Sequence, residues 1–183
     1  MSKKIIIAAI CLFAALIGLH IRNQRDITDF PVRLLEAIVK PTLVSSGTYK
    51  RLEYTISESP GINRVYVTLK FSSQNVFGAQ LDSTATMTLV PEYMFIDALY
   101  KSPYADNPLM QVKRVMYDHS REYSKEAYDG GHYKDPAYFY SHFYIGNVVI
   151  GQTPVPLDKI EYFNSELLLF RGAGGYPNDI PKF

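Results

Sequence analysis

Hydrophobic and polar positions alternate with a period of two in two neighbouring stretches, 64–72 and 80–90. Alternation of this length indicates strands with one buried face, because successive side chains of a strand point to opposite sides of a sheet. The segment Gln74–Gly78 between them contains Asn and Gly, which suit a hairpin turn. The residues that we expect to face the core are Val67, Leu69, Phe71, Leu81, Met87 and Leu89.

The run over 49–57 shows the same alternation, with Leu52, Tyr54 and Ile56 on one face. A Pro-Gly pair at 60–61 then turns the chain into the next stretch. The three stretches together predict an antiparallel β-meander.

Two other segments have apolar residues at helical spacing. Residues 26–41 predict an amphipathic helix that lies near a membrane or packs under the domain, with Pro41 as its end. Residues 108–129 predict a long helix, because Asn107-Pro108 suits a helix start and Gly130-Gly131 a helix end. The apolar positions of the long helix are Leu109, Val112, Met116, Tyr123 and Ala127.

The remaining elements are less sharply marked. A short helix is expected from Pro91 to Tyr100. Residues 137–151 are rich in β-forming residues, with Gly146-Asn147 as a possible two-residue turn. The apolar run 157–170 fits either a helix or a strand.

The predicted class is therefore α+β, with an N-terminal membrane helix before a small domain whose antiparallel meander is packed by a long helix. The predicted organisation is a signal anchor (1–25), an amphipathic juxtamembrane helix (26–46), an α+β extracytoplasmic domain (47–171) and a loop-like tail (172–183).

The N-terminal run from Ile5 to Ile21 has no charged residue and follows Lys3 and Lys4. Its 17 residues span about 25 Å as a helix, close to the thickness of a bilayer core. Small residues are missing at the positions that signal cleavage requires, so we prefer an uncleaved anchor to a cleaved signal peptide. We expect a cytoplasmic N-terminus and a domain on the far side of the membrane.

Charge and cysteine content narrow the function further. Residues 26–183 carry 15 basic and 18 acidic side chains, a balance that argues against nucleic-acid binding. The single cysteine, Cys11, lies inside the apolar run, so the domain has no thiol for catalysis or metal binding. No Asn-x-Ser/Thr acceptor site occurs, and together with the anchor this favours a bacterial periplasm.

No motif points to a reaction, and we expect no cofactor and no metal site. His119 and Glu122 share a face of the long helix, but a metal site needs further ligands. The glycine cluster at 172–175 is not followed by the helix that a phosphate-binding loop requires.

Aromatic residues carry the one positive signal for a surface function. On a strand over 138–145, Phe139 and Phe143 would face the core. The opposite face would present Tyr138, Tyr140, His142 and Tyr144. This face is either a protein interface, because exposed tyrosine is enriched there, or a strand face covered by the long helix.

These observations favour a single-span, membrane-anchored envelope protein that binds another protein as an accessory or assembly subunit. Two alternatives stay open. One is an enzyme, such as a hydrolase, whose site residues come from scattered loops. The other is a carrier of a small apolar ligand, with a pocket between the sheet and the long helix.

Overall fold

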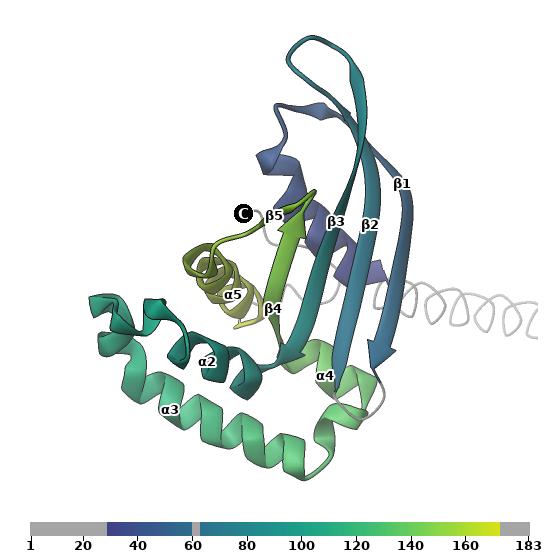
Figure 1. The fold of residues 1–183 in the computed structure, drawn as a ribbon. Coiled ribbons are helices and arrows are strands. Elements are labelled where there is room, and N and C mark those ends of the chain that lie inside the picture. The colour runs from purple at the N-terminus through teal and green to yellow at the C-terminus, as the bar shows by residue number, and fades with distance from the viewer. Residues whose placement is uncertain (1–28, 60–62, 173–183) are drawn as a thin grey trace, which may run out of the picture.

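The computed structural model describes residues 29–59 and 63–172 of the chain (Figure 1). Its centre is a five-stranded antiparallel sheet in which consecutive strands lie side by side. This confirms the α+β class and adds two strands to the predicted meander. The strands are β1 (Ser45–Ser59), β2 (Arg64–Gln74), β3 (Gln80–Pro91), β4 (Phe143–Ile150) and β5 (Thr153–Pro154).

The predicted alternation is confirmed along most of β2 and β3. The buried, inward-facing residues of these strands include Val65, Val67, Leu69, Phe71, Ala85, Met87 and Leu89. Leu81 is an exception, since its side chain is 54% exposed and does not face the core. The reason is that the first residues of β3 have no partner on β4, because the pairing of these two strands begins at Ala85.

The turn between β2 and β3 is also confirmed. The Asn75 side-chain oxygen accepts hydrogen bonds from the backbone N–H groups of Phe77 and Ala79, at 2.9 and 3.0 Å. Gly78 follows with φ of +78°, a conformation that glycine adopts without strain. The other predicted turn, at 60–61, lies outside the described residues.

A bulge in β1 changes which of its residues face inward. Arg51 lies opposite Phe71 and Glu53 lies opposite Lys70, so Leu52 is an extra residue without a partner on β2. One extra residue reverses the direction of the side chains that follow. Leu52 is therefore 47% exposed, and the prediction that it shares an inner face with the next apolar residues of the strand is wrong.

The amphipathic helix predicted before the sheet is present, with residues 29–39 helical. Phe30, Leu34 and Ile38 are at most 2% exposed. The Phe30 ring meets the ring of Phe143 in β4 edge to face, with centroids 6.0 Å apart. This helix therefore packs against the inner face of the sheet, and Figure 1 shows it crossing the strands.

The chain between β3 and β4 forms a helical layer at one end of the sheet (Figure 1). The predicted short and long helices are confirmed there, but the long helix packs along the short one, so the expectation that it covers the sheet is wrong. The short helix is α2 (Glu92–Tyr100) and the long helix is α3 (Pro108–Asp129). The other helices that follow the 29–39 helix are the 3-10 turns η1 (Lys40–Thr42), η2 (Pro103–Asp106) and η3 (His132–Lys134), and the α-helices α4 (Pro136–His142) and α5 (Leu157–Gly172).

The β structure expected over 137–151 is wrong in its first half, where the chain is helical as α4. The missed signal is Asp135-Pro136, because proline is favoured at the first position of a helix. The expected turn at Gly146-Asn147 is also wrong, because both residues lie within β4. Gly146 sits at a register shift, where a Cβ atom would approach the Val90 side chain to 3.1 Å.

The ambiguous run at 157–170 is a helix, α5, which lies beside β4. The buried Asn164 side chain accepts a hydrogen bond from the Ile145 N–H at 2.7 Å and donates one to the Ile145 carbonyl at 2.9 Å. In the part of the chain that the structure describes, no helix has the length and apolar character needed to cross a membrane. The run from Ile5 to Ile21 and the tail at 173–183 lie outside that part.

Candidate functional site

The four residues of the predicted aromatic face do not lie on one face. Tyr138 is partly buried on α4 and His142 is exposed at its end. Tyr140 and Tyr144 are each only 7% exposed, so the expectation that they are accessible is wrong. The expected burial of the two phenylalanines between them, at positions 139 and 143, is confirmed.

Helical geometry explains this separation. Residues four apart share a helix face, so the rings of Tyr138 and His142 stack with centroids 4.1 Å apart. Tyr140 points to another side of α4, and Tyr144 stacks on Phe95 of α2 at 5.6 Å. Burial raises the pKa of Tyr144 well above its ordinary value, and the neighbouring Glu92 carboxylate adds to this rise.

The largest accessible apolar feature of the helical layer lies on α3. Its side chains are spaced three, four and seven residues apart, so they form one stripe along the helix. Their exposed fractions are 79% for Val112, 80% for Val115, 74% for Met116 and 64% for Tyr123. The sequence pattern predicts the helix and three of these positions. The predicted packing of this helix on the sheet would bury the stripe, whereas the stripe is exposed.

The stripe continues into a shallow hollow between α3 and the segment that follows it. The hollow is lined by Tyr123, Glu126, Ala127, His132 and Tyr138. The His132 and Tyr138 rings lie 5.5 Å apart, and Tyr138 in turn stacks on His142. We call the four stripe residues together with His132, Tyr138 and His142 the docking surface.

Polar contacts on the opposite side of α3 hold the docking surface in place. The Tyr100 hydroxyl donates a hydrogen bond to Asp118 at 2.8 Å, and Arg121 forms an ion pair with Asp97. Both contacts join α3 to α2. They leave the apolar stripe directed away from the rest of the domain.

A third contact joins α3 to α5. The Glu161 carboxylate, in a residue only 4% exposed, accepts hydrogen bonds from Lys113 and from the Tyr117 hydroxyl. A buried carboxylate needs such partners, so this cluster fixes the position of α3 relative to α5. The docking surface is thus carried by a helix anchored on two sides.

The charges of α3 are balanced. The basic residues are Lys113, Arg114, Arg121 and Lys125, and the acidic residues are Asp118, Glu122, Glu126 and Asp129. A helix that binds anionic lipid or nucleic acid carries an excess of basic residues. The charges of α3 therefore do not have the basic excess of a helix that binds anionic lipid or nucleic acid.

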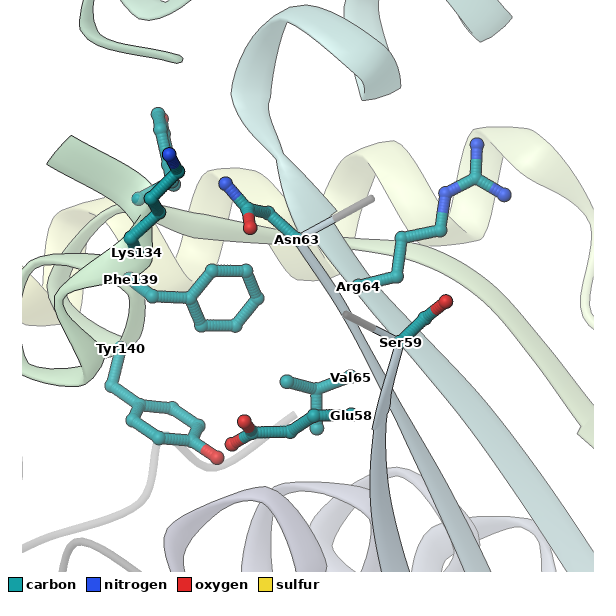
Figure 2. Close-up of a pocket in the computed structure, with 9 residues that line it drawn as sticks. Glu58, Ser59, Asn63, Arg64, Val65, Lys134, Phe139 and Tyr140 are labelled. Carbon is teal, nitrogen blue, oxygen red and sulfur yellow. The ribbon is translucent and has the colours of Figure 1, made fainter. Parts of the chain in front are cut away.

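Tyr140 lines a separate cavity of about 180 Å³ between the β1–β2 end of the sheet and the η3–α4 segment (Figure 2). Burial, and secondarily the charge of Glu58, raises the pKa of Tyr140 to about 12. The cavity is lined by Glu58, Ser59, Asn63, Arg64, Val65, Tyr133, Lys134, Phe139 and Tyr140.

Within residues 29–59 and 63–172, no cluster of three or more His, Cys, Asp or Glu side chains is arranged to hold a metal ion. No known protein family, curated protein or solved structure matches this chain.

Proposed function

We propose that this chain is a single-span, membrane-anchored envelope protein whose extracytoplasmic domain binds another protein as an accessory or assembly subunit. The observation that carries the proposal is the exposed stripe of α3, in which Val112, Val115, Met116 and Tyr123 are each 64–80% exposed. Contiguous apolar patches on soluble domains mark sites of association, because exposed apolar surface is otherwise selected against.

The energetics of burial support a protein partner. Burying a side chain such as Val115 or Met116 contributes about 1.5–3 kcal/mol of hydrophobic free energy. Four such residues at helical spacing suit a groove or a second helix that receives one helix face. The partner surface is thus apolar where it meets the stripe.

The aromatic end of the docking surface, around Tyr138, adds specificity for a partner. Tyr123 and Tyr138 offer large apolar rings with hydroxyl groups that tolerate water before binding. His132 and His142 lie beside them and supply donors and acceptors at the rim. Two members of the aromatic patch proposed from the sequence, Tyr138 and His142, thus remain in the proposed interface.

Membrane attachment is the second part of the proposal. It is supported by the uncharged run from Ile5 to Ile21 after Lys3 and Lys4. If this run is an uncleaved anchor, the protein stays in the membrane pellet after a carbonate wash and its intact mass includes residues 2–21. A soluble mature form that begins between residues 19 and 24 would contradict the anchor and leave the docking surface untouched.

Site-specific photo-crosslinking tests the docking surface. A photoreactive amino acid is placed at Val115 in the full-length protein within membranes of its own host, and a matched control has it at Lys125. Lys125 is an exposed residue of the same helix but lies off the stripe. We expect one discrete protein adduct from position 115 and none from position 125.

A second substitution makes the crosslinking result specific. Met116→Lys places a charge in the stripe without touching a buried residue, and it should abolish the adduct formed from position 115. Equal adducts from both positions, no adduct from position 115, or an adduct that persists in Met116→Lys would each overturn the proposed interface. The enzyme and carrier alternatives gain no specific observation from the described residues.

A further inference from the structure

The cavity beside Tyr140 has aromatic walls set at steep angles to each other. The rings of Phe139 and Tyr140 have centroids 5.5 Å apart and planes inclined by 88°. The rings of Tyr133 and Phe139 have centroids 6.2 Å apart and planes inclined by 78°. These three residues line the cavity but are only 4–7% exposed, so they offer a ligand a small area of ring surface. Ring faces attract cations through their negative electrostatic potential.

A carboxylate stands at the same cavity. Figure 2 shows the Glu58 carboxylate directed toward the hydroxyl end of Tyr140, across the cavity from Asn63. Glu58 is exposed, and among the described residues it takes part in no ion pair. Its charge reaches the aromatic wall, since it contributes to the raised pKa of Tyr140.

The two basic residues of the lining do not neutralise this carboxylate. In Figure 2 the Arg64 guanidinium extends away from the cavity on the far side of its strand. The Lys134 side chain extends past Asn63, away from Glu58. Among the side chains labelled in Figure 2, the groups directed inward are thus one carboxylate, one amide, the Val65 side chain and the rings of Phe139 and Tyr140.

We infer that this cavity is a binding site for an alkylammonium head group. A positive charge with short alkyl substituents fits both features, because the carboxylate supplies the counter-charge and the rings supply cation–π attraction and apolar contact. A volume of about 180 Å³ exceeds the space of a few water molecules and accommodates a group of this size. The inference does not depend on the proposed docking surface, which is formed by the stripe of α3 together with His132, Tyr138 and His142.

The same chemistry occurs in free alkylammonium compounds and in the head groups of membrane lipids. Binding is first measured by titrating the full-length protein, in non-ionic detergent, with choline. A parallel titration uses 3,3-dimethylbutan-1-ol, which has the shape of choline but no charge. We expect millimolar binding of choline and about tenfold weaker binding of the neutral alcohol, since the charge drives recognition.

Two variants on one strand make the test specific. Glu58→Gln removes the counter-charge from an exposed position and should weaken choline binding at least fivefold without changing the melting temperature. Glu53→Gln is the matched control, because Glu53 is an exposed carboxylate of β1 that pairs with Lys70 outside the cavity. This control should bind choline like the wild type.

Each result of these titrations either supports or overturns the inferred site. Equal binding of choline and the neutral alcohol, no binding of choline, or equal binding by wild type and Glu58→Gln would each overturn the inference. If choline binds as expected, vesicles of phosphatidylcholine are added as a competitor, with phosphatidylglycerol vesicles as the control. Displacement by phosphatidylcholine alone supports the site and assigns a lipid head group to it, whereas no displacement supports the site and assigns a free ligand.

Discussion

Two amphipathic helices of this protein differ in the exposure of their apolar stripes. The helix at 29–39 buries its stripe, with Phe30, Leu34 and Ile38 at most 2% exposed. The helix α3 exposes its stripe, with Val112 and Val115 near 80% exposed. Both segments show apolar residues at the same helical spacing, so the pattern alone does not say which stripe the domain covers.

The difference follows from what each helix meets. The 29–39 helix lies across the inner face of the sheet, where strand alternation has already gathered the apolar side chains. The helix α3 follows α2, and polar contacts from Asp118, Arg121 and Glu161 fix its inner side. An apolar stripe that residues 29–59 and 63–172 leave uncovered, on a helix that they hold in place, has the character of an association surface.

The largest effect is expected inside the core that the 29–39 helix closes. Phe71→Ala should destabilise the protein by about 3–5 kcal/mol, because it removes a ring that is 1% exposed and leaves a cavity. Lys70→Ala, on the outer face of the same strand, should change stability little. Denaturant unfolding of both variants measures the contrast, and similar losses would show that the two faces of β2 are wrongly assigned.

The buried helix should respond nearly as strongly. Leu34→Ala should cost about 2–5 kcal/mol, because the Leu34 side chain is fully buried between helix and sheet. The melting temperature measured by circular dichroism should fall accordingly. A loss below about 1 kcal/mol would remove the distinction between the 29–39 helix and α3.

An intermediate effect is expected at Glu36, which lies on the 29–39 helix. Burial by itself would raise the pKa of Glu36, but hydrogen bonds from Arg51 at 2.6 Å and Tyr49 at 2.7 Å outweigh burial and lower it. A lowered pKa stabilises the fold above the ordinary glutamate pKa, and this stabilisation is lost as the pH falls through the lowered value.

The variant Glu36→Gln tests this dependence. Its stability should fall below that of the wild type at neutral pH, and the gap should narrow as the pH is lowered to about 3, below the ordinary glutamate pKa. Urea unfolding at both pH values measures the gap. A gap that stays constant would show that the charge of Glu36 makes no contribution.

The smallest effect on stability is expected on α3. Val115→Ala should change the free energy of unfolding by no more than about 0.5 kcal/mol, because the side chain is exposed and alanine favours helix more than valine. The same substitution should weaken partner crosslinking from the neighbouring stripe positions. A large loss of stability would place Val115 in the core and would remove it from the docking surface.

The site was less predictable than the fold. The pattern around Tyr138 and His142 predicts an aromatic surface on a strand, with Tyr140 and Tyr144 on the same face. Asp135-Pro136 is the local signal for a helix start, and a helix separates these residues. The cavity beside Tyr140 joins Glu58 to residues more than 70 positions away, and no local pattern connects such positions.

Local sequence patterns predict the strands β2 and β3, the turn at Asn75–Gly78 and both amphipathic helices. These features depend on neighbours within a few residues, through side-chain alternation, turn conformation and helical spacing. No local pattern predicts that a bulge displaces Leu52, that α3 packs on α2, or that one stripe is buried while the other is exposed. Those outcomes depend on which surfaces meet across the fold, because burial is a property of the whole packed chain and not of a local period.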